Sequence, residues 1–205
     1  MYRSVPLRLS ILAAFIICGR FPWSASAAEP AWQPIFNGAD LSGWKPPEPN
    51  RWWSVREGVL HGENDPRRKG SVLWTRTPYR DFMIALEFRM GEGTVDSGVF
   101  LRNNDQIQIG QSGSLRRDMT ASPYIPGKGY PVEAEGVKEL LKPNDWNSLR
   151  IKAVGPQYTV WLNGKQVVSY KSDRAIESGP IGLQIHPGRT MEIDFRNIRV
   201  AKIGE

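Results

Sequence analysis

The sequence is poor in cysteine and histidine, and this scarcity excludes several kinds of active site. Its single cysteine, Cys18, lies in an apolar run near the N-terminus, and its only histidines are His61 and His186. If residue 18 is removed with that run, the folded protein has neither a cysteine nucleophile nor thiolate metal ligands. The two histidines form no metal-ligand spacing, so we expect no metal site. A cation held by carboxylates stays an alternative, and the sequence does not identify a cofactor.

No apolar run is long enough to cross a membrane. Arg3 and Arg8 precede an apolar run over 9–19, and small residues follow it. Spanning a bilayer takes ~20 apolar residues, and this pattern is typical of a secretory signal peptide. We expect a signal peptide over 1–28, a single secreted or periplasmic domain over 29–205, and no stable membrane insertion after cleavage. An uncleaved anchor is the alternative.

Basic residues do not gather into a stripe. The formal net charge of +6 comes from 27 basic and 21 acidic residues, and three of the arginines lie within 1–28. The two basic clusters are Arg67-Arg68-Lys69 and Arg116-Arg117. A nucleic-acid-binding surface requires a continuous basic patch or stripe, so we interpret these clusters as loop charge and expect no nucleic-acid partner.

Long amphipathic helices are also missing, and short alternating segments separated by turn residues predict an all-β sandwich of two antiparallel sheets. Asn163-Gly164 predicts a type I′ hairpin turn, because both positions accept a positive φ. Apolar parity changes after Phe195, which predicts a β-bulge near Arg196-Asn197. The expected strands are Trp52–Arg56, Val59–Gly62, Ser71–Thr75, Phe82–Met90, Ser97–Arg102, Gln106–Gly110, Asn147–Val154, Tyr158–Leu162, Gln166–Tyr170, Ile181–His186 and Met191–Ile203.

A long irregular stretch over 112–136 interrupts the strands. It is rich in proline and glycine, but Tyr124 and Tyr130 favour an ordered loop over a linker. One short helical turn is expected at Val137–Leu141.

Side chains of successive strand residues point to opposite faces, so each strand can be sorted by parity. One set is apolar and predicts a shared core: Leu86, Phe88, Val99, Leu101, Ile107, Ile109, Leu183 and Ile185. The other set is polar or glycine and predicts an open, concave floor suited to a sugar: Glu87, Arg89, Gly98, Phe100, Arg102, Gln106, Gln108, Gly110, Gly182, Gln184 and His186. An ordinary solvated face of an antiparallel sheet is the alternative.

Trp161 has the opposite parity to Val160 and Leu162, so it is the best candidate for an aromatic platform that stacks on a sugar. A tryptophan on a convex face is an equally simple interpretation.

The strands lack a pair of acids at alternating positions. Conventional glycoside hydrolysis needs two carboxyl groups about 5–9.5 Å apart across the scissile bond. The strand that carries Glu87 has Arg89 where the second acid would stand. This absence argues against a conventional jelly-roll glucanase.

Eight motifs together resemble the 3-keto-disaccharide hydrolase family, also described as 3-keto-glucoside 1,2-lyase/3-keto-2-hydroxy-glucal hydratase. The resemblance covers nearly all of residues 29–205. The motifs, in chain order, are Ile35–Trp44, Trp53–Leu60, Leu73–Thr75, Tyr79–Met90, Ser97–Arg102, Trp161–Gly164, Gly179–His186 and Phe195–Val200.

This resemblance implies a concanavalin A-like jelly roll that cleaves 3-keto-glycosides by removing the C2 proton, eliminating the C1 oxygen and adding water. Matching positions make Glu87 the candidate base, with Arg89 or Arg102 stabilising the enolate. His186 would protonate the leaving oxygen, and Gln108 and Gln184 would bind sugar hydroxyls. A salt-bridged pair is the alternative role of Glu87 and Arg89.

The chain departs from the family pattern at two places. Gln111 stands where an acid is expected, and Leu115-Arg116-Arg117 replaces an aliphatic-Tyr-Gly segment. A non-catalytic carbohydrate-binding module of the same fold is therefore the main alternative, and a structural or interaction domain is a third.

Overall fold

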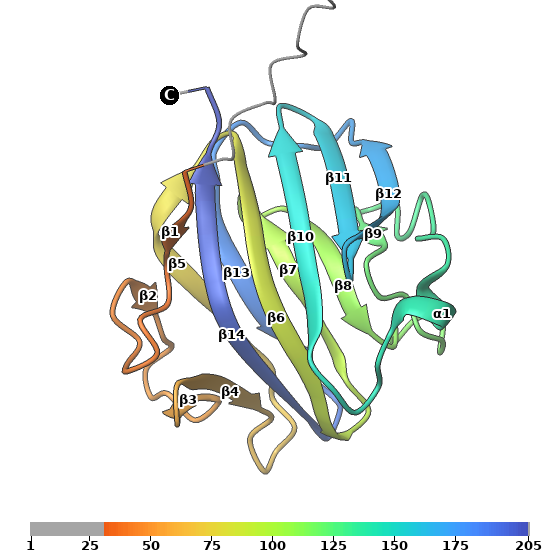
Figure 1. The fold of residues 1–205 in the computed structure, drawn as a ribbon. Helices are drawn as coiled ribbons and strands as arrows, with labels where there is room; N and C mark the ends of the chain where they lie inside the picture. Colours follow the sequence, from red (N-terminus) through yellow and green to blue (C-terminus); the bar gives the residue numbers. More distant parts are fainter. Residues whose placement is uncertain (1–30, 205) are drawn as a thin grey trace, which may run out of the picture.

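The computed structural model describes residues 31–204, so the expected signal peptide at 1–28 lies outside the described residues. Two antiparallel sheets pack face to face, with one short helix at their side (Figure 1). Within residues 31–204 no helix is both long and apolar enough to cross a membrane.

Sheet A has eight strands, and it lies at the front of Figure 1. Their spatial order is β12 (Lys165–Lys171), β11 (Gln157–Leu162), β10 (Asn147–Val154), β6 (Phe82–Gly93), β14 (Met191–Lys202), β4 (Val59–Glu63) and β3 (Trp53–Arg56), with β1 (Gln33–Pro34) also paired to β14.

Sheet B has six strands and lies behind sheet A in Figure 1. Their spatial order is β2 (Trp44–Lys45), β5 (Ser71–Tyr79), β13 (Gly179–Ile185), β7 (Asp96–Leu101), β8 (Asp105–Gly110) and β9 (Pro123–Tyr124). The two-residue strands β1, β2 and β9 were not predicted, because alternation cannot be recognised in so short a segment.

The predicted core is confirmed. All eight residues assigned to it by parity are buried in one hydrophobic cluster between the sheets, and the most exposed of them, Leu86, keeps only 3% of its surface. Glu87 and Gln184 are only partly buried and form side-chain contacts outside that cluster. The alternation along β6, β7, β8 and β13 therefore has the register that the sequence predicts.

The predicted turn and bulge are also present. Asn163 (φ 49°) and Gly164 (φ 85°) connect β11 to β12 with the positive φ angles of a type I′ turn. The register between β14 and β6 shifts between Arg196 and Arg199, and Asn197 takes a φ of 54°. This extra residue allows both Phe195 and Ile198 to face the core.

The irregular stretch after β8 is an ordered loop beside sheet B. Ala121 and Ile125 are fully buried, and the Ser122 hydroxyl accepts a hydrogen bond from the Ala134 amide at 2.9 Å. The helical turn α1 (Val137–Leu140) follows it, as predicted. The backbone of the loop pairs with β8 through Ala121 and Ser122, so the loop extends the edge of sheet B.

Candidate functional site

The polar side chains predicted to form one floor lie on two opposite surfaces. Glu87 and Arg89 project from β6 on the outer face of sheet A, whereas Gln108, Gln184 and His186 belong to sheet B. Since both groups point away from the shared core, the whole sandwich separates them. The prediction that Glu87 and His186 share one concave surface is therefore wrong. Parity tells which side chains avoid the core, but not which sheet carries them.

Glu87 and Arg89 are paired with residues of β14. Arg196 donates a hydrogen bond to Glu87 Oε2 at 2.6 Å, and Arg89 Nη2 donates to Asp194 Oδ2 at 2.7 Å. Both guanidinium groups also lie over the ring of Trp146, at 4.0 Å for Arg196 and 4.8 Å for Arg89. These contacts make a cross-strand network of sheet A.

Arg102 has a structural environment that differs from its predicted role in binding substrate. Strand β7 ends at Leu101, and the positive φ of Arg102 (55°) takes its side chain out of the strand alternation. Its guanidinium is 1% exposed, pairs with Asp81 Oδ1 at 3.1 Å, and donates to the carbonyl of Gly155 at 2.7 Å. It fastens the loops at one end of the sandwich.

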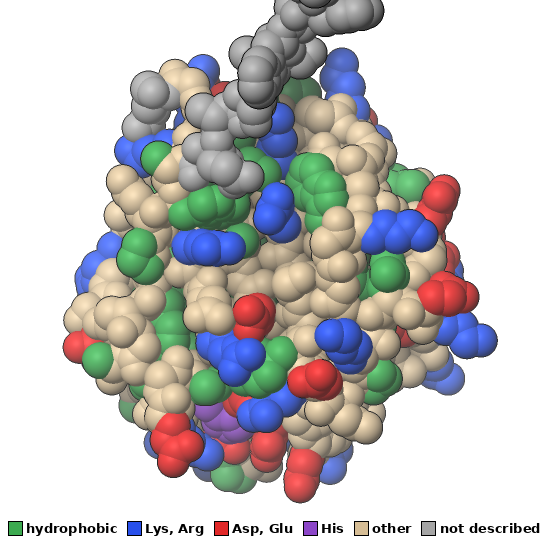
Figure 2. Space-filling model, viewed as in Figure 1, with side chains coloured by type: hydrophobic (Ala, Val, Ile, Leu, Met, Phe, Trp, Pro, Cys, Tyr) green, Lys and Arg blue, Asp and Glu red, His purple; other side chains and the backbone are tan. Residues whose placement is uncertain are grey.

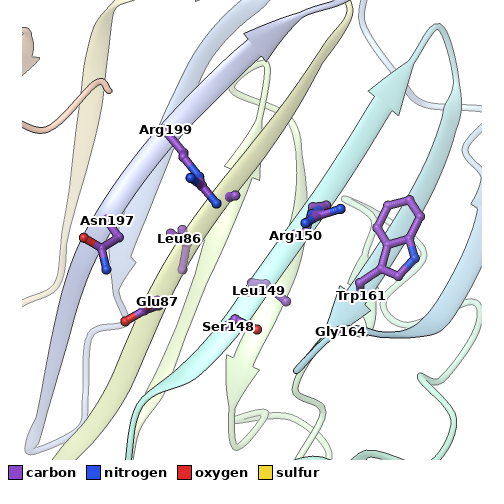
Figure 3. A pocket seen from close by; sticks show the side chains of 10 residues that line it. Leu86, Glu87, Ser148, Leu149, Arg150, Trp161, Gly164, Asn197 and Arg199 are labelled. Atoms are coloured by element: carbon purple, nitrogen blue, oxygen red, sulfur yellow. The ribbon is translucent and has the colours of Figure 1, made fainter. Parts of the chain in front are cut away.

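Trp161 lies on β11, on the outer face of sheet A. It lines a hollow of about 200 Å³ there, together with Glu87, Ser148 and Arg150 (Figure 3). The tryptophan is therefore remote from Gln108, Gln184 and His186, and it does not form a platform with them.

The outer face of sheet B carries a compact group of amides around one carboxylate. Gln106 Nε2 donates to Gln184 Oε1 at 2.8 Å, and Gln108 Nε2 donates to Asp96 Oδ1 at 3.0 Å. The register places Gln184, Gly98 and Gln108 side by side on three neighbouring strands. Asp96 is 2% exposed, and its Oδ2 atom accepts no hydrogen bond. Buried carboxylate oxygens usually accept a hydrogen bond, so this oxygen is available to a further donor.

His186 follows β13 directly and lies beside this carboxylate. Its Nδ1 atom is 2.7 Å from the carbonyl oxygen of Pro187 and 3.8 Å from Asp96 Oδ2. A carbonyl only accepts hydrogen bonds, so Nδ1 carries the proton and Nε2 of the neutral ring holds a lone pair. The Arg189 Nε atom lies 3.9 Å from the same Asp96 oxygen. A base, a cation and a buried anion therefore meet at one end of β13.

Aromatic side chains flank the amides on both sides. Trp74 and Phe100 pack with ring centroids 5.3 Å apart, and Tyr124 and Tyr130 pack at 5.2 Å. Burial raises the pKa of Tyr130, a hydrogen bond with Ser112 opposes the rise, and the nearby charge of Asp96 adds to it. Its hydroxyl stays protonated at neutral pH and can donate a hydrogen bond.

The glycines of this face do not leave an empty depression. A Cβ atom on Gly98 would lie 2.0 Å from Gln106 Nε2, and one on Gly182 would lie 2.4 Å from the Trp74 ring. Gln106 and Trp74 thus occupy the space above these glycines. The open floor expected over these glycines is therefore filled by neighbouring side chains.

Sequence reasoning missed Asp96 and Arg189. Asp96 shares the parity of Gly98 and Phe100, but the predicted strand began one residue later, at Ser97. Extending the alternation backwards by one position would have found it. Arg189 follows the strand in an irregular segment, and parity says nothing about such positions. Among residues 31–204, no cluster of three or more His, Cys, Asp or Glu side chains is placed to hold a metal ion.

Comparisons with known proteins agree with this architecture. The model of the 3-keto-alpha-glucoside-1,2-lyase-like domain matches residues 31–201. The chain belongs to this family. No protein in a comparison with curated sequences matched significantly.

Solved structures share the fold. A candidate glycosyl hydrolase from Parabacteroides distasonis has a TM-score of 0.63 and 26% identity, over 84% of this chain and 99% of that one. A second such protein from this organism has a TM-score of 0.64 and 18% identity, over 84% and 94%. The carbohydrate-binding module CBM66 from Bacillus subtilis has a TM-score of 0.52 and 14% identity, over 78% and 96%.

The environment of Arg102 leads to a stability prediction. Arg102→Met keeps the length of the side chain but removes its charge and donors, so Asp81 loses its cation and several carbonyls lose their donor. Breaking a buried ion pair in this way typically costs about 3–5 kcal/mol. We expect that decrease in the free energy of unfolding, measured by urea denaturation. The exposed Arg76→Met is the control, and equal stability of both variants would contradict the structural role.

Proposed function

We propose that this protein cleaves 3-keto-glycosides on the outer face of sheet B, with His186 as the acid–base residue. The family match and the likeness to a glycosyl hydrolase support a role in carbohydrate chemistry. The observation that carries the proposal is the Nδ1–H contact of His186 with the Pro187 carbonyl, which leaves the Nε2 lone pair directed away from that contact. A base of this kind is sufficient to remove a proton made acidic by a ketone.

The proposed reaction begins at the carbon beside the ketone. His186 Nε2 takes the C2 proton, and the C–H electron pair forms the enolate of C2 and C3. The enolate then expels the glycosidic oxygen from C1, which leaves a double bond between C1 and C2, and the imidazolium returns the proton to the departing oxygen. Addition of water across the new double bond completes a net hydrolysis. No pair of carboxylates is required, which suits the strands of this chain.

The neighbours of His186 have roles that follow from their charge. Arg189 supplies positive charge for the enolate oxygen, as is usual where an anion develops. The Asp96 carboxylate stabilises the imidazolium at 3.8 Å and holds Arg189 nearby. Gln184 is half-buried and, with the aromatic rings at the sides, is placed to contact sugar hydroxyls. Glu87 has no part in this mechanism.

A non-catalytic carbohydrate-binding module is the second candidate. Gln111 stands beside the amide group in place of an acid, and its backbone carbonyl accepts a hydrogen bond from Gln108 at 3.4 Å. A face made of amides and aromatic rings binds sugars without needing to react with them. The tests below separate the two functions, because a module binds without turnover.

The first test uses substrate chemistry. We expect release of the aglycone from 3-keto-glucosides and none from the unoxidised glucosides, because only the ketone acidifies C2. Deuterium at C2 is expected to slow the reaction if proton removal limits the rate. Product is measured by chromatography. Equal rates with and without the ketone would contradict the elimination mechanism, and binding without product would favour the module.

The second test locates the base. His186→Gln keeps polarity but removes basicity, so we expect turnover to fall by about 10²–10⁴-fold, the usual contribution of a general acid or base. Glu87→Gln, on the opposite face, is the matched control and is expected to retain the activity of the unaltered protein. The reverse pattern, with Glu87→Gln inactive and His186→Gln active, would show that the reaction takes place on the outer face of sheet A.

We also propose that the domain is secreted or periplasmic after removal of residues 1–28, on the basis of the N-terminal pattern. Intact-mass measurement on exported protein is expected to give a chain that starts near residue 28 or 29 and lacks cysteine. A mass that retains Cys18 would contradict this proposal.

A further inference from the structure

The outer face of sheet A carries a hollow that the proposed reaction does not use. It holds about 200 Å³ and lies over β6, β10, β11 and β14. Figure 2 views this face, where arginine and lysine side chains surround an indented centre. Because the catalytic proposal concerns the other side of the sandwich, the hollow raises a separate question of binding.

Small side chains create the hollow. Ala85 on β6 pairs with Arg150 of β10 on one side and with Arg199 of β14 on the other. Arg150 in turn pairs with Trp161 of β11. The methyl group of Ala85 therefore lies between the side chains of Arg150 and Arg199. These residues form one row across neighbouring strands, and the row ends at Trp161. Gly164, at the rim, adds no side chain.

The two arginines are not neutralised. Within residues 31–204, neither Arg150 nor Arg199 forms an ion pair, whereas Glu87, the acidic residue of the lining, is already paired with Arg196 at 2.6 Å. Both guanidinium groups lie near the Trp32 ring, at 5.9 Å from its centroid for Arg150 and 5.1 Å for Arg199. The hollow thus presents two cations with unused hydrogen-bond donors.

The remaining lining suits a sugar. Trp161 offers an aromatic surface in the lining, and Trp32 offers another beside the two arginines. Ser148 and the exposed Asn197 offer a hydroxyl and an amide. Figure 3 shows Arg199 directed from β14 over β6, with Arg150 and Trp161 beside each other across the hollow. Aromatic faces pack on the apolar side of sugar rings, while hydroxyl and amide groups bond the polar edge.

We propose that this hollow binds an acidic sugar unit of an oligosaccharide, with Arg150 and Arg199 holding its carboxylate. The planar guanidinium group matches a carboxylate in a two-point contact. The volume is below the about 300–1,000 Å³ of drug-sized ligand pockets, which fits one sugar ring and not a larger group. Two cations over one row are too few for the basic stripe of a nucleic-acid surface.

Calorimetric titration tests this proposal with an oligosaccharide of uronic acid units and the same oligosaccharide after its carboxylates are reduced to alcohols. We expect the acidic form to bind about tenfold or more tightly than the reduced form. Arg150→Ala and Arg199→Ala are each expected to weaken the acidic form by about tenfold, the usual effect of losing one charged hydrogen-bond partner. Cleavage of 3-keto-glucosides should be unchanged in both variants.

Lys152→Ala is the matched control, since Lys152 lies two residues from Arg150 on the same exposed face but outside the lining of the hollow. This variant should change the affinity by less than about threefold, since a distant exposed charge usually contributes little to binding. Losses as large as those of Arg150→Ala would show diffuse attraction and overturn the site. Equal affinity for both oligosaccharides, or none, would also overturn it. Thermal unfolding shows whether each variant is folded. If Arg199→Ala does not fold, Arg199→Gln replaces it.

Discussion

Burial of one apolar face from each sheet is the constraint on which the rest of this structure depends. Alternation gives every long strand one inward and one outward side, and the inward sides of β6, β7, β8 and β13 meet in one cluster that excludes water. Polar side chains on these strands are therefore forced onto two outer surfaces with the whole core between them. No rearrangement short of unfolding brings Glu87 and His186 together.

Much of this arrangement could be predicted from the sequence. It depends on the alternation of apolar and polar residues and on which residues form tight turns and bulges. The eight core positions, the Asn163-Gly164 turn and the bulge at Asn197 all follow from residues adjacent in the chain. The distribution of strands between sheets depends on long-range pairing, as when β13 inserts between β5 and β7. A parity pattern contains no signal for that pairing, so residues from two sheets were merged into one predicted floor.

The candidate site was harder to predict for a related reason. Gln108, Gln184 and His186 were found because they alternate with core residues, but Arg102 has the same parity and still turns inward. Its positive φ arises at the strand end, where alternation no longer determines direction. Asp96 and Arg189 also lie at or beyond strand ends. Loops and strand ends bring functional groups together through tertiary contacts that a single sequence does not reveal.

The two outer faces differ in how small residues are used, and this difference separates their chemistry. On sheet B, Gly98 and Gly182 are covered by Gln106 and Trp74, and the amides form hydrogen bonds with one another and with Asp96. On sheet A, Ala85 adds only a methyl group between Arg150 and Arg199, which form no ion pair within residues 31–204, so a hollow remains there. Packed, mutually hydrogen-bonded groups favour a reaction that needs fixed geometry. Exposed cations around an open hollow favour recognition of charge. Under the two proposals, the sandwich would therefore carry a reactive face and a binding face on opposite sides of its core.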